Sequence, residues 1–138
     1  MQLSIVIPCF NESDSIARFP AELFGPLDAL RVDYEVVAVN DGSTDETGSG
    51  LERLAGSHPV KVVTHERNRG LGAALRTGFA AAAGEWVVTL DADLTFAPAA
   101  ISALLLRQSQ TGADLVAGSP YLTRDGMAGV PWIRRAPS

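Results

Sequence analysis

Short runs of apolar, mostly β-branched residues alternate along the chain with longer stretches in which apolar residues recur every three or four positions. The short runs predict strands and the longer stretches predict helices. The predicted strands are 3–8, 35–40, 60–64, 86–90 and 114–118, and the predicted helices are 14–30, 44–56, 71–83 and 98–111. This alternation is typical of an α/β fold, in which a mostly parallel sheet is covered by helices on both faces.

Residues near the ends of the predicted helices agree with these ranges. Pro98 suits a first helical turn, and Gly84 and Gly112 stand where helices are expected to stop. Pro20 and Pro26 interrupt the first helical stretch. Because proline removes a backbone donor and clashes with the preceding turn, we expect the first helix to be bent or split.

Composition limits the classes of partner and compartment. The 138 residues are 46% hydrophobic and 20% charged, as expected for one globular domain. Eleven basic against sixteen acidic residues give a net charge of -5, the wrong sign for a nucleic-acid partner. Cys9 is the only cysteine, which excludes an intrachain disulfide and fits a reducing compartment. Since no run reaches the ~18 apolar residues of a membrane span, we expect a cytoplasmic protein.

A cluster of polar residues follows each of the first four predicted strands. The clusters are Asn11–Glu12, Asp41–Ser43, Glu66–Gly70 and Asp91–Asp93. The carboxyl ends of parallel strands form one edge of an open sheet, where ligands bind. The four clusters therefore predict one ligand site at that edge.

Asp91 and Asp93 are the candidate metal ligands. In an extended segment residues i and i+2 point to the same side, so both carboxylates can face one Mg²⁺ or Mn²⁺ ion that also binds substrate phosphates. The alternative is that the two acids hydrate a loop and cap the helix near Pro98. An EF-hand is excluded because Phe96 and Ser102 stand where its loop needs Gly and Glu.

Other phosphate chemistries fit the sequence poorly. Asp91–Thr95 is similar to the nucleophile motif of haloacid-dehalogenase-type phosphatases, but Lys61, the only lysine, lies upstream of it rather than downstream. Gly70–Leu75 lacks the third glycine of a dinucleotide fingerprint, and no P-loop sequence is present.

Asp41 has two possible roles. It could accept a hydrogen bond from a nucleobase, or cap the helix that follows. Ser43–Glu46 has the pattern of a capping box in which Ser43 is the N-cap, and this favours a ligand role for Asp41.

Five motifs in order resemble the signature of family 2 glycosyltransferases with the GT-A fold, a Rossmann-like arrangement. They are Ile5–Glu12, Val39–Asp45, Asn68–Gly72, Leu90–Leu94 and Gly118–Tyr121. Gly129–Arg135 resembles a segment of the dolichyl- or polyprenyl-phosphate hexose transferases within that family.

The resemblance implies an inverting, metal-dependent hexosyltransferase. Its donor would be a nucleotide sugar of the GDP-mannose or UDP-glucose type, its acceptor a polyprenyl or dolichyl phosphate at the inner face of a membrane, and its cofactor Mg²⁺ or Mn²⁺. The implied nucleotide-sugar site is Pro8, Phe10, Glu12, Asp41, Asn68, Arg69, Gly70, Asp91, Ala92 and Asp93; the implied acceptor-phosphate site is Arg124, Arg134 and Arg135.

The sequence departs from the family pattern at three positions. Asn40 stands where the family often has Asp, Thr95 where the polyprenyl branch usually has Gln, and Pro120 where that branch usually has Arg. Two alternatives therefore stay open: a family 2 transferase acting on a glycan hydroxyl, and a nucleotide-binding fragment without activity. We expect a nucleotide-sugar-binding core over 1–118 and the start of an acceptor-binding segment over 119–138, in a chain truncated at its C-terminus.

Overall fold

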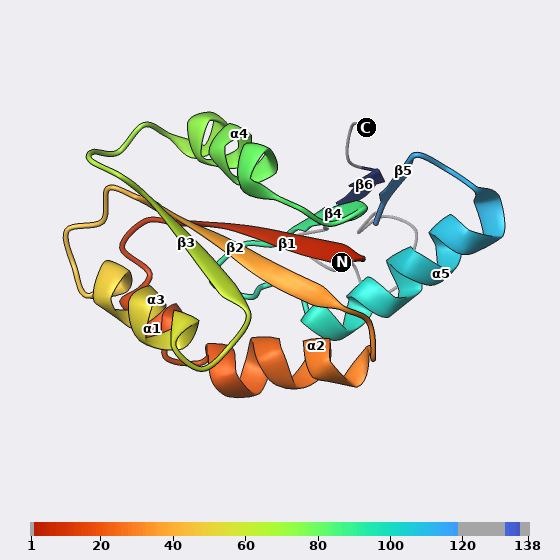
Figure 1. The fold of residues 1–138 in the computed structure, drawn as a ribbon, viewed down its shortest axis with the longest axis horizontal. Helices are drawn as coiled ribbons and strands as arrows, with labels where there is room; N and C mark the ends of the chain where they lie inside the picture. The colour runs from red at the N-terminus through yellow and green to blue at the C-terminus, as the bar shows by residue number, and fades with distance from the viewer. Residues whose placement is uncertain (1, 119–131, 136–138) are drawn as a thin grey trace.

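The computed structural model describes residues 2–118 and the backbone of 132–135. These residues form one six-stranded sheet in the order β3-β2-β1-β4-β6-β5 (Figure 1). Its strands are β1 (Leu3–Cys9), β2 (Tyr34–Asp41), β3 (Val60–His65), β4 (Trp86–Thr89), β5 (Leu115–Ala117) and β6 (Trp132–Arg135). Strands β1 to β4 are parallel, whereas β6 runs antiparallel to both β4 and β5. The predicted mostly parallel sheet is confirmed, and β6 is a strand that the sequence pattern did not predict.

The helices lie close to their predicted ranges. They are α1 (Ser13–Ile16), the π-helical turn η1 (Pro20–Phe24), α2 (Gly25–Ala29), α3 (Thr47–Ala55), α4 (Leu71–Ala81), the 3₁₀ turn η2 (Pro98–Ala100) and α5 (Ile101–Thr111). The first predicted helix is split into three pieces, as expected from its prolines. Helix α5 stops at Gly112, as predicted, and this glycine has the left-handed conformation.

The alternating side chains of β1 supply two separate cores. Leu3, Ile5 and Ile7 face a large core that also takes side chains from α1, η1, α2, α3 and α5. Val6 faces a smaller core under α4, together with Val37 and other residues of β2 and β4. Figure 1 shows α4 alone on one face of the sheet and the other labelled helices on the opposite face. Because β1 is buried on both faces, its pattern is a continuous apolar run.

Glycine allows α4 to lie close to the sheet. A Cβ atom added at Gly78 would come within 2.3 Å of Cγ1 of Val6, a separation that real side chains do not tolerate. A second contact fixes the chain after α4, where the buried Ser4 hydroxyl accepts a hydrogen bond from the N–H of Gly84 at 2.8 Å. These contacts hold the C-terminal half of α4 and the chain after it against β1.

Two boundary predictions are wrong. Ser43 is not the N-cap, because α3 begins at Thr47 and its first N–H is bound by the Asp45 side chain at 2.9 Å. Gly84 is not a helix stop, since α4 ends at Ala81. Gly84 instead packs against β1, where an added Cβ would lie 2.7 Å from the backbone nitrogen of Ser4.

The described residues include no helix that is long and apolar enough to cross a membrane.

Candidate active site

A cavity of about 280 Å³ opens at the carboxyl ends of β1 and β2. Its walls come from the end of β1, the end of β2 and the β3–α4 loop with the first turns of α4. The lining residues are Pro8, Cys9, Phe10, Glu12, Asp41, Asn68, Gly70, Leu71 and Ala74. Six of the residues predicted to bind the nucleotide sugar line this one cavity, although they are distant in sequence.

Sequence reasoning missed three of the lining residues. Leu71 and Ala74 lie one turn apart on α4, and only the helix position indicates that both face the cavity. Cys9 was interpreted as a small apolar residue at a strand end. Burial, followed by the nearby Glu12, raises the pKa of the Cys9 thiol to about 12, so Cys9 is a neutral wall residue and no nucleophile at neutral pH.

Two large apolar side chains are exposed at the cavity. Phe10 is 46% exposed and Leu71 is 63% exposed, whereas the large apolar side chains of β1 are buried. Exposed aromatic and aliphatic faces next to a concavity are typical of ligand sites, because a planar ring can cover them.

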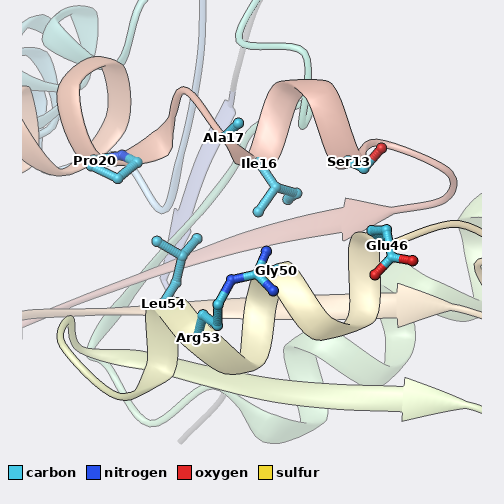
Figure 2. A pocket seen from close by; sticks show the side chains of 8 residues that line it. All are labelled: Ser13, Ile16, Ala17, Pro20, Glu46, Gly50, Arg53 and Leu54. Carbon is cyan, nitrogen blue, oxygen red and sulfur yellow. The ribbon is translucent and has the colours of Figure 1, made fainter.

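A second, smaller cavity of about 160 Å³ lies between α1 and α3 (Figure 2). Its lining residues are Ser13, Ile16, Ala17, Pro20, Glu46, Gly50, Arg53 and Leu54. It contains none of the residues predicted to bind substrate or metal.

The loops that follow β1 and β2 are tied to one another. The Asn11 side-chain oxygen accepts a hydrogen bond from the N–H of Thr44 at 2.9 Å, and the N–H of Glu12 donates to the Thr47 hydroxyl at 2.8 Å. The N–H of Asn11 also donates to the Ser43 hydroxyl at 3.0 Å. Ser43 therefore joins two loops instead of capping a helix. These bonds fix Phe10 and Glu12, which flank Asn11, relative to β2.

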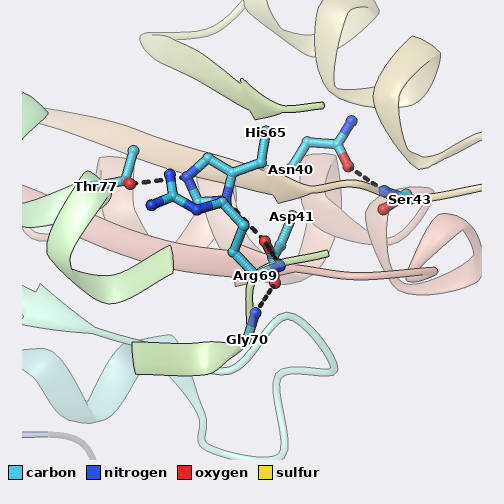
Figure 3. A network of polar contacts seen from close by, with 7 residues as sticks. All are labelled: Asn40, Asp41, Ser43, His65, Arg69, Gly70 and Thr77. Atoms are coloured by element: carbon cyan, nitrogen blue, oxygen red, sulfur yellow. Dashed lines mark hydrogen bonds and ion pairs between the residues drawn. The ribbon is translucent and has the colours of Figure 1, made fainter. Parts of the chain in front are cut away.

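Asp41 is the centre of a buried polar network (Figure 3). Its Oδ1 atom accepts from Nδ1 of His65 at 2.7 Å and from the N–H of Arg69 at 2.9 Å, and its Oδ2 atom accepts from the N–H of Gly70 at 3.0 Å. Burial by itself raises the pKa of Asp41, but the hydrogen bonds from His65, Arg69 and Gly70 outweigh it and hold the pKa below its usual value. Asp41 is therefore an ionised carboxylate that lines the cavity and binds the β3–α4 loop.

Asn68, Arg69 and Gly70 belong to that loop. Asn68 and Gly70 line the cavity, while Arg69 contributes its backbone N–H to Asp41 and exposes its side chain. The loop can approach β2 because residue 42 is glycine with a φ of +72°; a Cβ there would lie 2.3 Å from the backbone of Arg67 and Asn68.

The expected extended geometry of Asp91–Asp93 is wrong. Strand β4 ends at Thr89, and the N–H of Leu94 donates to the carbonyl oxygen of Asp91 at 3.0 Å, which closes a turn. Leu94 has a positive φ of 54°. In a turn, the rule that residues i and i+2 point to the same side no longer applies. The turn nevertheless follows β4, the neighbour of β1, at the carboxyl edge.

The three residues of this turn have different surroundings. Ala92 is buried in the larger core, while Asp91 and Asp93 are exposed. The Asp93 carboxylate accepts from the N–H of Thr95 at 3.0 Å. This bond, a side-chain hydrogen bond from Thr95 and the positive charge of Arg18 lower the pKa of Asp93, so its carboxylate is ionised at neutral pH.

This donor set fits an open divalent-metal site. The described residues contain no group of three or more His, Cys, Asp or Glu side chains that could enclose an ion. Mg²⁺ is commonly held by only one or two carboxylates, and its other positions are filled by water and substrate phosphates. The turn supplies two exposed carboxylates, which is the number of protein ligands that such a site needs.

Of the predicted acceptor residues, the structure describes only the backbone of Arg134 and Arg135. That backbone does not lie at this edge. The backbone of Arg134 is paired with Val87, and that of Arg135 with Trp86, the first residue of β4. Both positions therefore lie toward the amino end of β4, away from the Asp91–Asp93 turn. Arg124 lies outside the described residues.

Residues 4–136 match the sequence model of the family described as Glycosyl transferase family 2. The chain belongs to this family. Family membership accounts for the ordered motifs and confirms the resemblance recognised in the sequence.

The names of two curated relatives describe sugar transferases of dolichol phosphate and of undecaprenyl phosphate. The chain is 34% identical over 137 residues to a dolichol-phosphate mannosyltransferase of Pyrococcus furiosus, covering 98% of this chain and 38% of the relative. It is 40% identical over 138 residues to an undecaprenyl-phosphate 4-deoxy-4-formamido-L-arabinose transferase of Pseudomonas fluorescens, covering 99% of this chain and 39% of the relative. The family 2 chain thus spans about two fifths of these relatives.

A solved structure confirms the GT-A fold. The chain resembles a mannosyltransferase from Pyrobaculum calidifontis, solved in complex with GDP-Man and Mn²⁺, with a TM-score of 0.78 and 25% identity. The match covers 97% of this chain and 44% of that one.

Proposed function

We propose that this family 2 chain binds a nucleotide sugar for the inverting transfer of a hexose to a polyprenyl or dolichyl phosphate. The observation that carries the proposal is the cavity at the ends of β1 and β2, beside the turn that presents Asp91 and Asp93. The names of the two curated relatives support a lipid-linked phosphate as the acceptor.

The cavity suits the nucleoside part of the donor. Phe10 and Leu71 offer apolar faces to a base and a ribose, and Asp41 offers an anionic acceptor for an N–H or O–H group. Glu12, which is partly exposed and held by Ser15 at 2.9 Å, offers a second acceptor at the cavity wall. Both a uracil and a guanine base carry such N–H donors, so the proposal covers UDP-sugars and GDP-sugars.

Asp91 and Asp93 are proposed to hold Mg²⁺ or Mn²⁺ at the diphosphate. A divalent ion held there would stabilise the negative charge that develops on the departing nucleoside diphosphate. The turn carries both carboxylates, and the buried Ala92 between them packs in the larger core. Asp93 is already ionised, so ion binding there releases no proton from it at neutral pH.

A phosphate acceptor would let the transfer proceed without a protein base. A phosphomonoester has its second pKa near ~6, so it is mostly a dianion at neutral pH and attacks without losing a proton first. A glycan hydroxyl needs a carboxylate base. Arg134 and Arg135 are not included in the proposed acceptor contact because of their position along β4, and the role of Arg124 stays a prediction.

The proposal is tested by following labelled hexose from GDP-mannose and UDP-glucose into membrane lipids. We expect label in the fraction extracted by organic solvent, and loss of that label in the Asp91→Asn and Asp93→Asn variants. Label found only in water-soluble glycan would reject a lipid phosphate as the acceptor. No transfer from either donor, in a protein that binds neither nucleotide, would reject the transferase proposal itself.

A further inference from the structure

His65 connects three parts of the fold through its ring. It is the last residue of β3 and is 8% exposed. Nδ1 contacts the carboxylate of Asp41 on β2 at 2.7 Å, and Nε2 contacts the hydroxyl of Thr77 on α4 at 2.8 Å. Figure 3 shows the ring between these two partners. No sequence motif indicated a role for this residue.

The partners determine which ring nitrogen carries the proton. An ionised carboxylate can only accept hydrogen bonds, so Nδ1 must donate to Asp41. In the neutral ring, Nε2 then accepts from the hydroxyl of Thr77. The ring of His65 therefore links α4, through β3, to β2 by two hydrogen bonds.

This chain leaves one acceptor position of Asp41 for a ligand. A carboxylate has about four acceptor positions, two on each oxygen. Oδ1 uses both of its positions on His65 and Arg69, while Oδ2 uses one on Gly70. Asp41 also lines the cavity, and its Oδ2 atom keeps one acceptor position that an N–H or O–H group of a ligand can use.

The same carboxylate fixes the loop that forms one wall of the cavity. Asn68 and Gly70 line the cavity, and the loop that carries them rests on Gly42 and on the two N–H bonds to Asp41. If the Asp41 carboxylate turns, both the free acceptor position and the loop move together. His65 is the only side chain among the described residues that donates a hydrogen bond to Asp41.

We propose that His65 is a positioning residue for nucleotide binding. Its Nδ1–H holds the Asp41 carboxylate so that Oδ2 accepts an N–H of the nucleobase while the Asn68–Gly70 segment is kept against the cavity. The inference rests on the proposed function, because it needs a nucleotide in this cavity. It adds a residue that does not itself line the cavity.

Two amide variants separate the two ring nitrogens. The side-chain amide of His65→Asn can place an N–H near the position of Nδ1, and that of His65→Gln reaches the position of Nε2. The affinity for UDP and GDP is measured by calorimetry with Mn²⁺ present. For whichever nucleotide binds wild type more tightly, we expect His65→Gln to have about tenfold lower affinity than wild type, as for loss of one hydrogen bond to a charged group. We expect the affinity of His65→Asn to stay within about threefold of wild type.

Tyr34→Phe is the control for a general loss of stability. It removes the bond from the Tyr34 hydroxyl to Asp28, 2.7 Å long, and neither residue lines the cavity. We expect it to lower the melting temperature and leave nucleotide affinity unchanged. Equal affinity in His65→Gln and wild type, or equal weakening in the two amide variants, would overturn the role of His65. Failure of wild type to bind either nucleotide would instead overturn the proposed function, and the inference with it.

Discussion

The guanidinium of Arg18 donates a hydrogen bond to the backbone carbonyl oxygen of Asp93 at 3.0 Å. Its other terminal nitrogen donates to the carboxylate of Glu22 at 3.0 Å. Arg18 lies between α1 and η1, so the first helical region braces the turn that carries the two candidate metal ligands. The pair with Glu22 is about half exposed and adds little stability by itself, but it restricts the side chain of Arg18 to one direction.

Removing this brace should weaken metal-dependent nucleotide binding. Arg18→Ala frees the Asp93 carbonyl and loosens the turn, so we expect the affinity for nucleotide with Mn²⁺ to fall about three- to tenfold, in the range for one hydrogen bond from a charged group. Isothermal titration with Mn²⁺ and then with EDTA measures the effect. Arg107→Ala, which removes an exposed arginine from α5, is the matched control for the change in net charge. An equal effect of both substitutions would contradict a local role for Arg18.

Two glycines of α4 should respond in opposite ways to alanine. At Gly78 the new methyl group meets Val6, so we expect Gly78→Ala to lower the free energy of unfolding by about 1 to 3 kcal/mol, as for other overpacked cores. At Gly72 the nearest atom is a terminal nitrogen of the flexible Arg76 at 3.8 Å, so Gly72→Ala should be neutral or stabilising by up to about 1 kcal/mol. Urea denaturation of both variants measures the difference. Equal stability of the two variants would show that α4 is not in close contact with β1.

The stability of the fold should depend on pH through Asp41. Its folded-state pKa is depressed, so its contribution is fully present above the ordinary aspartate value of about 3.9 and is lost as pH falls through the lower folded-state pKa. We expect the free energy of unfolding to decline below about pH 4. Asp41→Asn should be less stable than wild type at pH 7 by about 1 to 3 kcal/mol, because buried donors lose a charged acceptor, and should show a shallower decline in acid. Parallel acid profiles for the two proteins would contradict this contribution.

The order of elements and the position of the site follow directly from the sequence. Alternating apolar runs locate β1 to β4, and the rule for parallel sheets then places the polar residues that follow them at one edge. For this reason Glu12, Asp41 and Asn68 could be predicted to lie close together, and the cavity brings them together. The roles of Pro8 and Phe10 came from the family resemblance alone.

The contacts that shape the site could not be predicted in the same way. The turn after Asp91 depends on Leu94 in the left-handed conformation, which a leucine does not indicate. Ser43 has the sequence pattern of a helix cap, but its hydroxyl is taken by the neighbouring loop. Arg18 and His65 act through partners far away in sequence, and β6 lies between β4 and β5 in the sheet although it follows both in the sequence. Such long-range pairings leave no local pattern.

The most direct test of the central claim is the affinity for UDP and GDP with Mn²⁺ and with EDTA, in wild type and in the Asp91→Asn, Asp93→Asn double variant. The account predicts that wild type binds at least one nucleotide more tightly with Mn²⁺, and that the double variant binds it with one weak affinity whether or not the ion is present. The same Mn²⁺ enhancement in the double variant would contradict the claim that these two carboxylates hold the ion at the diphosphate.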